Sequence, residues 1–333
     1  MVSESRGTRS GARSGLAWVW SDALLGLVYA LPAAGVALHD VTKGAAFAVG
    51  IVPPAVMGLR PLRKGRRATA VLGLLVGLPM VLGSLLAHAP VLAVAGLFAA
   101  GIGAVVLAQR SRAGTIALSL ALPMIGVGLS YTELGTAVGL AAIMVGGALY
   151  ATAASMAWPE RPPPPTPVAP PPVPTTSYGV LVGAAGASAA AIGFLLDLDH
   201  VGWACAAALL VIRPAAEMQE IRSVGRIASV VLGALAAIGV VRLDPAAVWF
   251  ALAFLLVGAT VSATHTSRWY ITSAFTTFLV FVLLLYGNVA DAGSRFGERV
   301  VETVLGVALA CLFGLVVPEV AHVATLEPAR SDP

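Results

Sequence analysis

Charged side chains are scarce in this chain of 333 residues, of which only 11% are Asp, Glu, Lys or Arg. Soluble domains carry about 25% charged residues, so an ordinary water-exposed surface is excluded. Cysteine is also rare: Cys205 and Cys311 both lie inside apolar runs, where we expect small buried side chains without a disulfide. Hydrophobic residues make up 58% of the chain, and the mean hydropathy is +0.91. This composition excludes disorder and predicts a polytopic membrane protein.

Apolar runs long enough for membrane helices recur along the whole sequence. A helix needs roughly 20 apolar residues to cross the hydrocarbon core, and no stretch has the alternation of a membrane barrel. We therefore predict an all-α polytopic membrane protein with about twelve transmembrane helices. The first six segments are 22–38, 44–59, 68–87, 91–108, 114–130 and 134–156. The second six are 178–196, 201–212, 224–241, 246–263, 270–286 and 296–317.

Basic residues fall mainly in alternate loops, which predicts the orientation of the chain. If both termini are inside, 16 of the 20 Lys and Arg residues lie on the inner side. Cytoplasmic loops of membrane proteins are enriched in these residues. The net charge of +4 is therefore explained by topology, and we expect no nucleic-acid partner.

A proline-rich stretch, 159–174, divides the sequence into two flanks that resemble each other at an offset of 160 residues. Pro54 matches Pro214, and the Gly-Arg pair ending at Arg66 matches the pair ending at Arg226. We predict a first six-helix half (1–157), a cytoplasmic linker (158–177), a second six-helix half (178–318) and a cytoplasmic tail (319–333). Because each half has an even number of helices, the two repeats should be parallel.

The second half holds the first two groups of polar residues that could carry function. Asp199 and His200 lie beside Trp203 at a turn, which is either a solvated hairpin with an interfacial Trp or a proton or substrate relay. Arg213 follows the short segment 201–212, whose counterpart is interrupted by Pro53-Pro54. Paired short or broken segments point to a transport site, where Arg213 would clasp a carboxylate or else only set topology.

A third polar group lies at the start of the last segment. Arg295, Glu298, Arg299 and Glu302 are three or four residues apart and share one helix face. They either pair with one another or supply a functional charge, and Glu302 should face the bundle interior. We find no phosphate-binding loop, metal-ligand spacing or nucleophile elbow, and predict a protein that is not an enzyme and needs no cofactor or metal.

Several of these motifs together resemble the fusaric acid resistance and aromatic acid exporter family. The resemblance rests on Asp199 to Trp203, Arg213-Pro214, the Arg222-to-Arg226 segment and the run from Arg299 to Gly306. It implies efflux of aromatic carboxylic acids or similar amphipathic anions, proton coupling and homo-oligomers in a bacterial plasma membrane. The candidate substrate-binding residues are Arg213, Arg226 and Trp203, and the candidate proton carriers are Asp199, His200, Glu302 and Arg299.

The first half lacks counterparts to the key polar residues, so we expect the second half to build the site. At the offset of 160, Gly139 stands opposite Arg299 and Ala142 opposite Glu302. Two other functions remain open. One is a passive anion channel like the related plant malate channels, and the other is a membrane scaffold whose linker and basic loops dock partners or anionic lipids.

Overall fold

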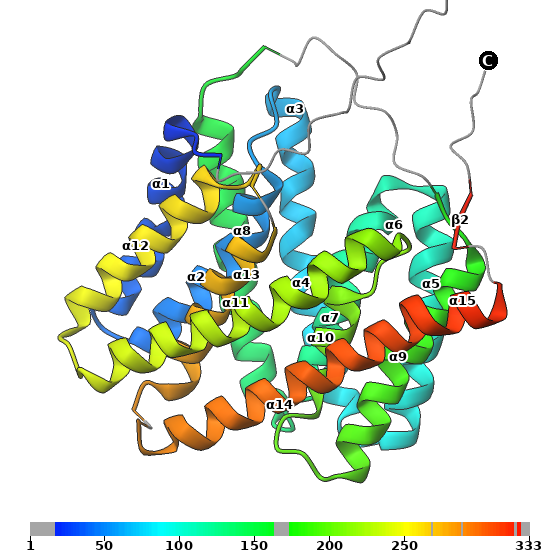
Figure 1. Cartoon of the computed structure of the whole chain (residues 1–333). Coiled ribbons are helices and arrows are strands. Elements are labelled where there is room, and N and C mark those ends of the chain that lie inside the picture. The colour runs from blue at the N-terminus through cyan, green and yellow to red at the C-terminus, as the bar shows by residue number, and fades with distance from the viewer. Residues whose placement is uncertain (1–16, 163–172, 268, 288, 323–324, 328–333) are drawn as a thin grey trace, which may run out of the picture.

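The structure is a computed structural model that describes residues 17–162, 173–267, 269–287, 289–322 and 325–327. The middle of the predicted linker (163–172) and the ends of the chain (1–16 and 328–333) lie outside these residues. The described part is helical except for one short antiparallel pair, β1 (Val173–Pro174) with β2 (Leu326–Glu327). The predicted all-α class is therefore confirmed (Figure 1).

The helices follow the predicted segments closely. Before the linker they are α1 (Trp20–Ala37), α2 (Val41–Met57), α3 (Arg63–Arg66), η1 (Arg67–Thr69), α4 (Ala70–Leu86), α5 (Pro90–Arg110), α6 (Arg112–Ile116), η2 (Ala117–Ala121), α7 (Leu122–Gly128) and α8 (Leu134–Ala157). After it they are α9 (Thr176–Leu195), α10 (Val201–Val211), α11 (Ala216–Arg242), α12 (Ala247–Ala263), α13 (Trp269–Leu285), η3 (Val289–Asp291), α14 (Ala292–Cys311), η4 (Leu312–Val316) and α15 (Val317–Ala321).

Among the described residues, seven helical stretches are long and apolar enough to cross a membrane. They are α1, α3 to α4, α5, α8, α9, α11 and α14 to α15. Five shorter apolar helices match the remaining predicted segments, and α10 is the shortest of them. At about 1.5 Å per residue, a helix of that length reaches only about halfway across the hydrocarbon core.

Helix α2 corrects one expectation from the sequence. Pro53 and Pro54 were expected to break this segment, but α2 continues through both and ends at Met57. Each proline removes one backbone donor, so the helix forgoes the bonds to the carbonyls of Val49 and Gly50 while continuing to Met57. The helix stops instead at Gly58, whose φ of 68° suits glycine.

The two larger hydrophobic cores each combine helices from both sides of the linker. One is built mainly from α1, α2, α12 and α13, and the other from α5, α7, α9 and α10. Glycines allow the closest crossings: a Cβ on Gly26 of α1 would collide with the backbone of Gly258 in α12. Gly101 of α5 and Gly183 of α9 meet in the same way. The chain thus interleaves its two flanks into one bundle.

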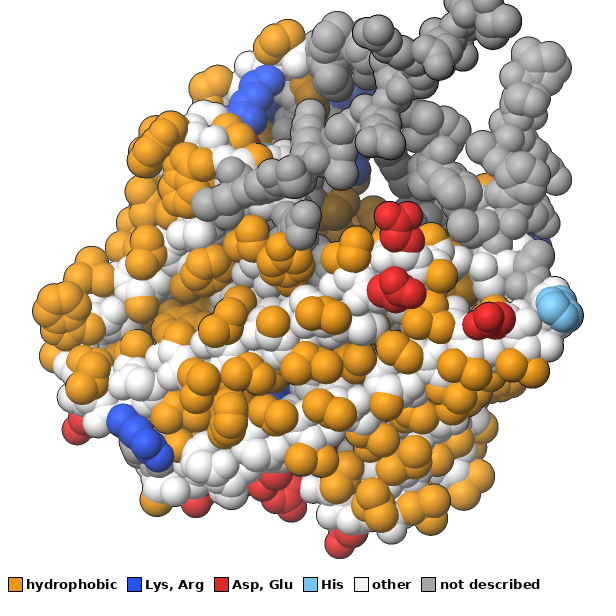
Figure 2. All heavy atoms as spheres, viewed as in Figure 1, with side chains coloured by type: hydrophobic (Ala, Val, Ile, Leu, Met, Phe, Trp, Pro, Cys, Tyr) orange, Lys and Arg blue, Asp and Glu red, His pale blue; other side chains and the backbone are white. Residues whose placement is uncertain are grey.

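The outer surface of this bundle is apolar. Helix α11 and the α14-to-α15 stretch run diagonally across one face of the molecule (Figure 1), and Figure 2 shows hydrophobic side chains covering them. Exposed residues on this face include Val224, Leu232, Leu235, Val301 and Val304. Soluble proteins rarely expose so large a continuous apolar patch, so this face is suited to lipid hydrocarbon.

Candidate functional site

The turn before α10 is held against the first turns of α14 by four charged or titratable residues. Arg295 Nη1 lies 3.7 Å from an Asp199 carboxylate oxygen and 3.3 Å from Glu298 Oε2. The same Nη1 lies 3.3 Å from His200 Nδ1. Because a guanidinium only donates, His200 Nδ1 must accept, and the ring is neutral with its proton on Nε2. We call Asp199, His200, Arg295 and Glu298 the turn cluster.

The neutral state of His200 agrees with its surroundings. Burial is the main cause that lowers the pKa of His200 to about 4, and the positive charge of Arg295 lowers it further. His200 Nδ1 is also 3.7 Å from Glu298 Oε2, a contact that becomes an ion pair only when the ring is protonated. At neutral pH the turn cluster is therefore held by Arg295.

Trp203 connects the turn cluster to the interior of the bundle. It is only 3% exposed, so its ring packs inside the bundle and is covered by protein. The His200 ring stacks on it with centroids 4.0 Å apart and planes at 19°. The guanidinium carbon of Arg299, in α14, lies 4.4 Å from the centroid of the Trp203 ring. A buried cation over an indole face gains about 2 kcal/mol or more.

Three side chains on the buried face of α14 have polar atoms without hydrogen-bond partners in the described structure. These atoms are Arg299 Nε and Nη1, Glu302 Oε2 and Thr303 Oγ1. All three residues are buried, and Glu302 is 2% exposed, so the prediction that it faces the interior is confirmed. Buried charged groups are nearly always hydrogen-bonded, and such a set is typical of a site that receives a solute or water.

A second buried guanidinium, that of Arg226, lies on α11. Arg226 Nη1 donates to Ser273 Oγ of α13 at 2.7 Å, while its Nε has no hydrogen-bond partner among the described residues. Arg226 and Arg299 are close enough for their charges to repel. Two cations in an apolar bundle create a positive centre that attracts an anion. We call Arg226, Arg299, Glu302, Thr303 and Trp203 the arginine site.

Arg213 does not belong to this arrangement. It follows the C-terminal end of α10, whereas Trp203 is near its start, so about 15 Å of helix separates them. Its Nη1 donates to the Ile212 carbonyl, and its backbone N–H donates to Gln219 Oε1 at 3.1 Å. Of the seven predicted site residues, Trp203, Arg226, Arg299 and Glu302 come together, Asp199 and His200 border them, and Arg213 lies apart.

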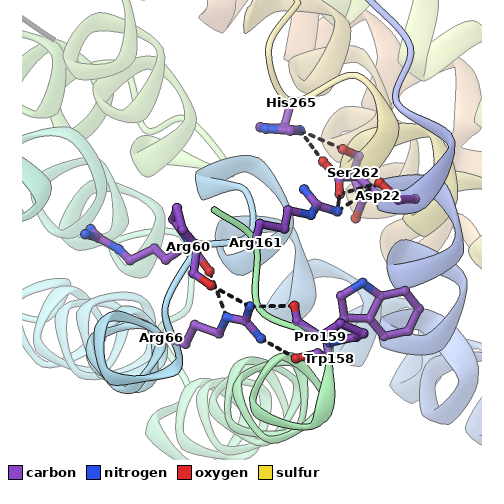
Figure 3. Close-up of polar contacts among 10 residues, drawn as sticks. Asp22, Arg60, Arg66, Trp158, Pro159, Arg161, Ser262 and His265 are labelled. Carbon is purple, nitrogen blue, oxygen red and sulfur yellow. Dashed lines mark hydrogen bonds and ion pairs between the residues drawn. The ribbon is translucent and has the colours of Figure 1, made fainter. Parts of the chain in front are cut away.

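Arg66, which matches Arg226 in the first flank, has a different set of hydrogen bonds. All five N–H groups of Arg66 donate to backbone carbonyls, namely those of Arg60, Pro61, Ser155, Trp158 and Pro159. Figure 3 shows this guanidinium enclosed by the chain around it. Arg66 is therefore a structural arginine that holds the end of α8, whereas Arg226 retains a free donor.

Sequence reasoning missed a second polar cluster, formed by Asp22, Arg161 and His265 (Figure 3). Asp22 is 3% exposed in the first turn of α1. Its carboxylate is ion-paired with Arg161 and lies 3.5 Å from His265 Nδ1. An acidic residue inside an apolar segment is a signal that could have found this cluster.

The helical bundle, its apolar surface and its buried cations define a multi-pass membrane protein. Residues 187–313 match the family described as fusaric acid resistance protein-like, which confirms the resemblance inferred from the sequence. The match runs from α9 to η4 and includes every member of the turn cluster and the arginine site. No curated protein matches the chain. The family supports a transporter-like function and is one of membrane transporters, not of enzymes.

Proposed function

We propose that the protein exports small amphipathic organic anions, of which aromatic carboxylic acids are the best fit. The observation that carries this proposal is the arginine site, where two buried nitrogens of Arg299 have no hydrogen-bond partner among the described residues and lie beside the face of Trp203. A planar guanidinium binds a carboxylate through two parallel hydrogen bonds. An aromatic substrate would place its ring against Trp203 in an offset or edge-to-face contact.

Arg226 gives the site its second positive charge. Its buried Nε has no partner among the described residues, while its Nη1 donates to Ser273, which also accepts from the Ser229 hydroxyl. Serines keep this cation in place without neutralising it, so it still attracts an anion. Export of an anion is favoured by an inside-negative potential, which supplies about 2.3 kcal/mol per charge for each 100 mV.

Proton coupling would act through Glu302. This carboxyl group lies one helical turn from Arg299 on the same face of α14, and its Oε2 is free within the described structure. An ionised Glu302 competes with the substrate for Arg299, whereas a protonated Glu302 does not. We therefore expect protonation of Glu302 to strengthen anion binding. Asp199 and His200 would provide the path from the turn cluster.

The proposal includes twelve membrane segments in two parallel six-helix repeats, with both termini on the cytoplasmic side of a bacterial plasma membrane. Helix contacts support the repeat, because they come in pairs at the offset of 160 residues. Helix α1 packs on α12 as α9 packs on α5, and α2 packs on α13 as α10 packs on α7. Such reciprocal contacts are what a two-fold relation generates. The apolar face of α11 and α14 would contact lipid or a second copy of the chain.

Flux into proteoliposomes tests this function. We would follow a labelled aromatic carboxylate at defined potential and pH gradient for wild type, Arg299→Gln and Arg226→Gln, with Arg213→Gln as the matched control. The proposal predicts saturable flux that both buried-arginine variants lose at least tenfold and the control retains. Equal flux in Arg299→Gln and wild type would contradict it. Non-saturating current without proton movement would instead favour the anion channel.

A further inference from the structure

The cluster missed by sequence reasoning joins three separate parts of the chain. Asp22 lies at the start of α1, His265 follows the end of α12, and Arg161 lies at the start of the linker. These parts meet where α1 and α12 cross, at the end of the bundle from which the linker leaves (Figure 3). The glycine contact between Gly26 and Gly258 packs the same two helices deeper in the bundle.

The hydrogen bonds of the cluster show which atom of His265 carries a proton and which group balances the charge of Asp22. The Ser262 carbonyl can only accept, so His265 Nδ1, 2.9 Å away, must carry a proton. The same N–H points towards Asp22 at 3.5 Å. Arg161 donates to the other carboxylate oxygen of Asp22 and, at 2.9 Å, to the Ser21 hydroxyl. Arg161 thus supplies the full positive charge that balances a buried carboxylate.

Backbone contacts fix the linker segment that carries Arg161. The Trp158 and Pro159 carbonyls accept from Arg66, and the Arg161 N–H donates to the Pro61 carbonyl at 3.1 Å. Glu160 accepts from the backbone N–H of Arg63 at 2.8 Å. The linker is therefore anchored beside α3, and the Arg161 side chain reaches across to α1.

A small hollow of about 10 Å³, room for about one water molecule, lies beside this ion pair, between α1, α2 and α12. Its lining includes Asp22, Tyr29, Gly58 and Ser262. The Ser262 hydroxyl is buried there and forms no hydrogen bond with the described residues. The side of the α1–α12 crossing that faces the linker is thus polar and incompletely packed, and Arg161 is bound to the carboxylate that lines it.

The related crossing of α5 and α9 has no such cluster in the described structure. At the offset of 160 residues, Val182 stands for Asp22, Ile102 for Ser262 and Val105 for His265. Val105 and Val182 belong to an apolar core there. An ion pair is therefore not required to pack two such helices. Its presence is specific to the α1–α12 crossing beside the linker.

We propose that Arg161 and Asp22 form a latch by which the linker keeps the α1–α12 crossing closed at this end of the bundle. The Arg161 side chain neutralises Asp22, whose carboxylate lines the hollow. When the pair separates, Asp22 is left as a buried carboxylate without its cation, which favours entry of water between α1 and α12. The latch does not depend on which anion is carried.

Thiol labelling tests the latch in the full chain. In a Cys205→Ala, Cys311→Ala background, Ser262→Cys places a thiol in the hollow, and its rate of reaction with a membrane-permeant maleimide is measured in proteoliposomes. Arg161→Gln should raise this rate at least tenfold, because the backbone anchor stays while the latch is lost. Arg161→Lys keeps the charge and should raise it less than threefold. An unchanged rate in Arg161→Gln overturns the latch.

Ser84→Cys is the matched control, because Ser84 is equally buried and also lacks a hydrogen-bond partner in the described structure, but lies on α4. Its labelling should not respond to Arg161→Gln, and an equal rise at both thiols would indicate general loosening and overturn the proposal. If Ser262→Cys does not fold, the labelling experiment is replaced by thermal unfolding of Arg161→Gln, Asp22→Asn and the double variant. Arg161→Gln should lower the unfolding midpoint in wild type but not in Asp22→Asn, and equal lowering in both would overturn the latch.

Discussion

The guanidinium of Arg299 lies over the ring of Trp203, 4.4 Å from its centroid, although 96 residues separate them in the chain. The contact joins α10 to α14, and the Nε and Nη1 nitrogens of Arg299 have no partners in the described structure. A cation stacked on an aromatic face keeps its capacity to bind an anion. This relationship is the basis of the anion site.

Replacing Arg299 should reduce transport without reducing stability. Arg299→Met removes a buried cation whose Nε and Nη1 make no hydrogen bonds, and an apolar side chain of similar length is often neutral or stabilising at such a position. We expect at least a tenfold loss of anion flux with an unfolding midpoint equal to or above that of wild type. Flux is measured in proteoliposomes and unfolding in detergent. A large drop in the midpoint would show that Arg299 is structural.

The two matched arginines, Arg66 and Arg226, should respond in opposite ways. Arg66→Met removes five hydrogen bonds to backbone carbonyls, three of them in or just after the last turn of α8, and we expect a loss of about 3 kcal/mol or more. Arg226→Met removes one bond to Ser273 and a poorly satisfied charge, and should cost much less. Denaturant unfolding of both variants tests this, and equal losses would refute the distinction.

His200 should make the protein less stable in acid. Its pKa is lowered to about 4 by burial and by Arg295. As the pH falls from about 6.5 to 4, the unfolded chain takes up a proton at His200 while the folded chain does not. Stability from this group is therefore present above pH 6.5 and lost progressively below it. His200→Gln should flatten that part of the pH profile of unfolding, and an unchanged profile would contradict the assignment.

Replacing glycine by alanine should destabilise the protein at the α1–α12 crossing but not elsewhere on α1. A Cβ on Gly26 would collide with the Gly258 backbone, whereas one on Gly35 meets nothing within 4 Å. Gly26→Ala should destabilise the protein by about 1–3 kcal/mol through overpacking. Gly35→Ala should leave stability unchanged or raise it, because alanine favours helix. If the two variants unfold alike, the close crossing is not under steric control.

Composition and hydrophobic runs were sufficient to predict the helical class and the twelve helical segments. The buried position of Glu302 was also predictable, since a charge within an apolar helix must face the interior. The position of Trp203 was not, because the cation that covers it comes from a distant helix. The sequence grouped Arg213 with Trp203 as a substrate-binding candidate, but the length of α10 separates the two residues.

The Asp22 cluster has a signal in the sequence that the polar groups of the second half do not include. An aspartate within the first turn of an apolar helix requires a partner. Its partners lie 139 and 243 positions further along the chain, so only the fold could identify Arg161 and His265. Likewise, no sequence pattern distinguishes the fully bonded Arg66 from Arg226.

Binding of an aromatic carboxylate to the purified protein tests the anion site most directly. A ligand that binds only the folded state raises the unfolding free energy by about 2.7 kcal/mol at 100 times its dissociation constant. Titration with benzoate should raise the unfolding midpoint of wild type and of Arg213→Met in a saturable manner, and leave Arg299→Met unshifted. An equal, saturable shift in Arg299→Met would contradict the assignment of the arginine site as the anion-binding site.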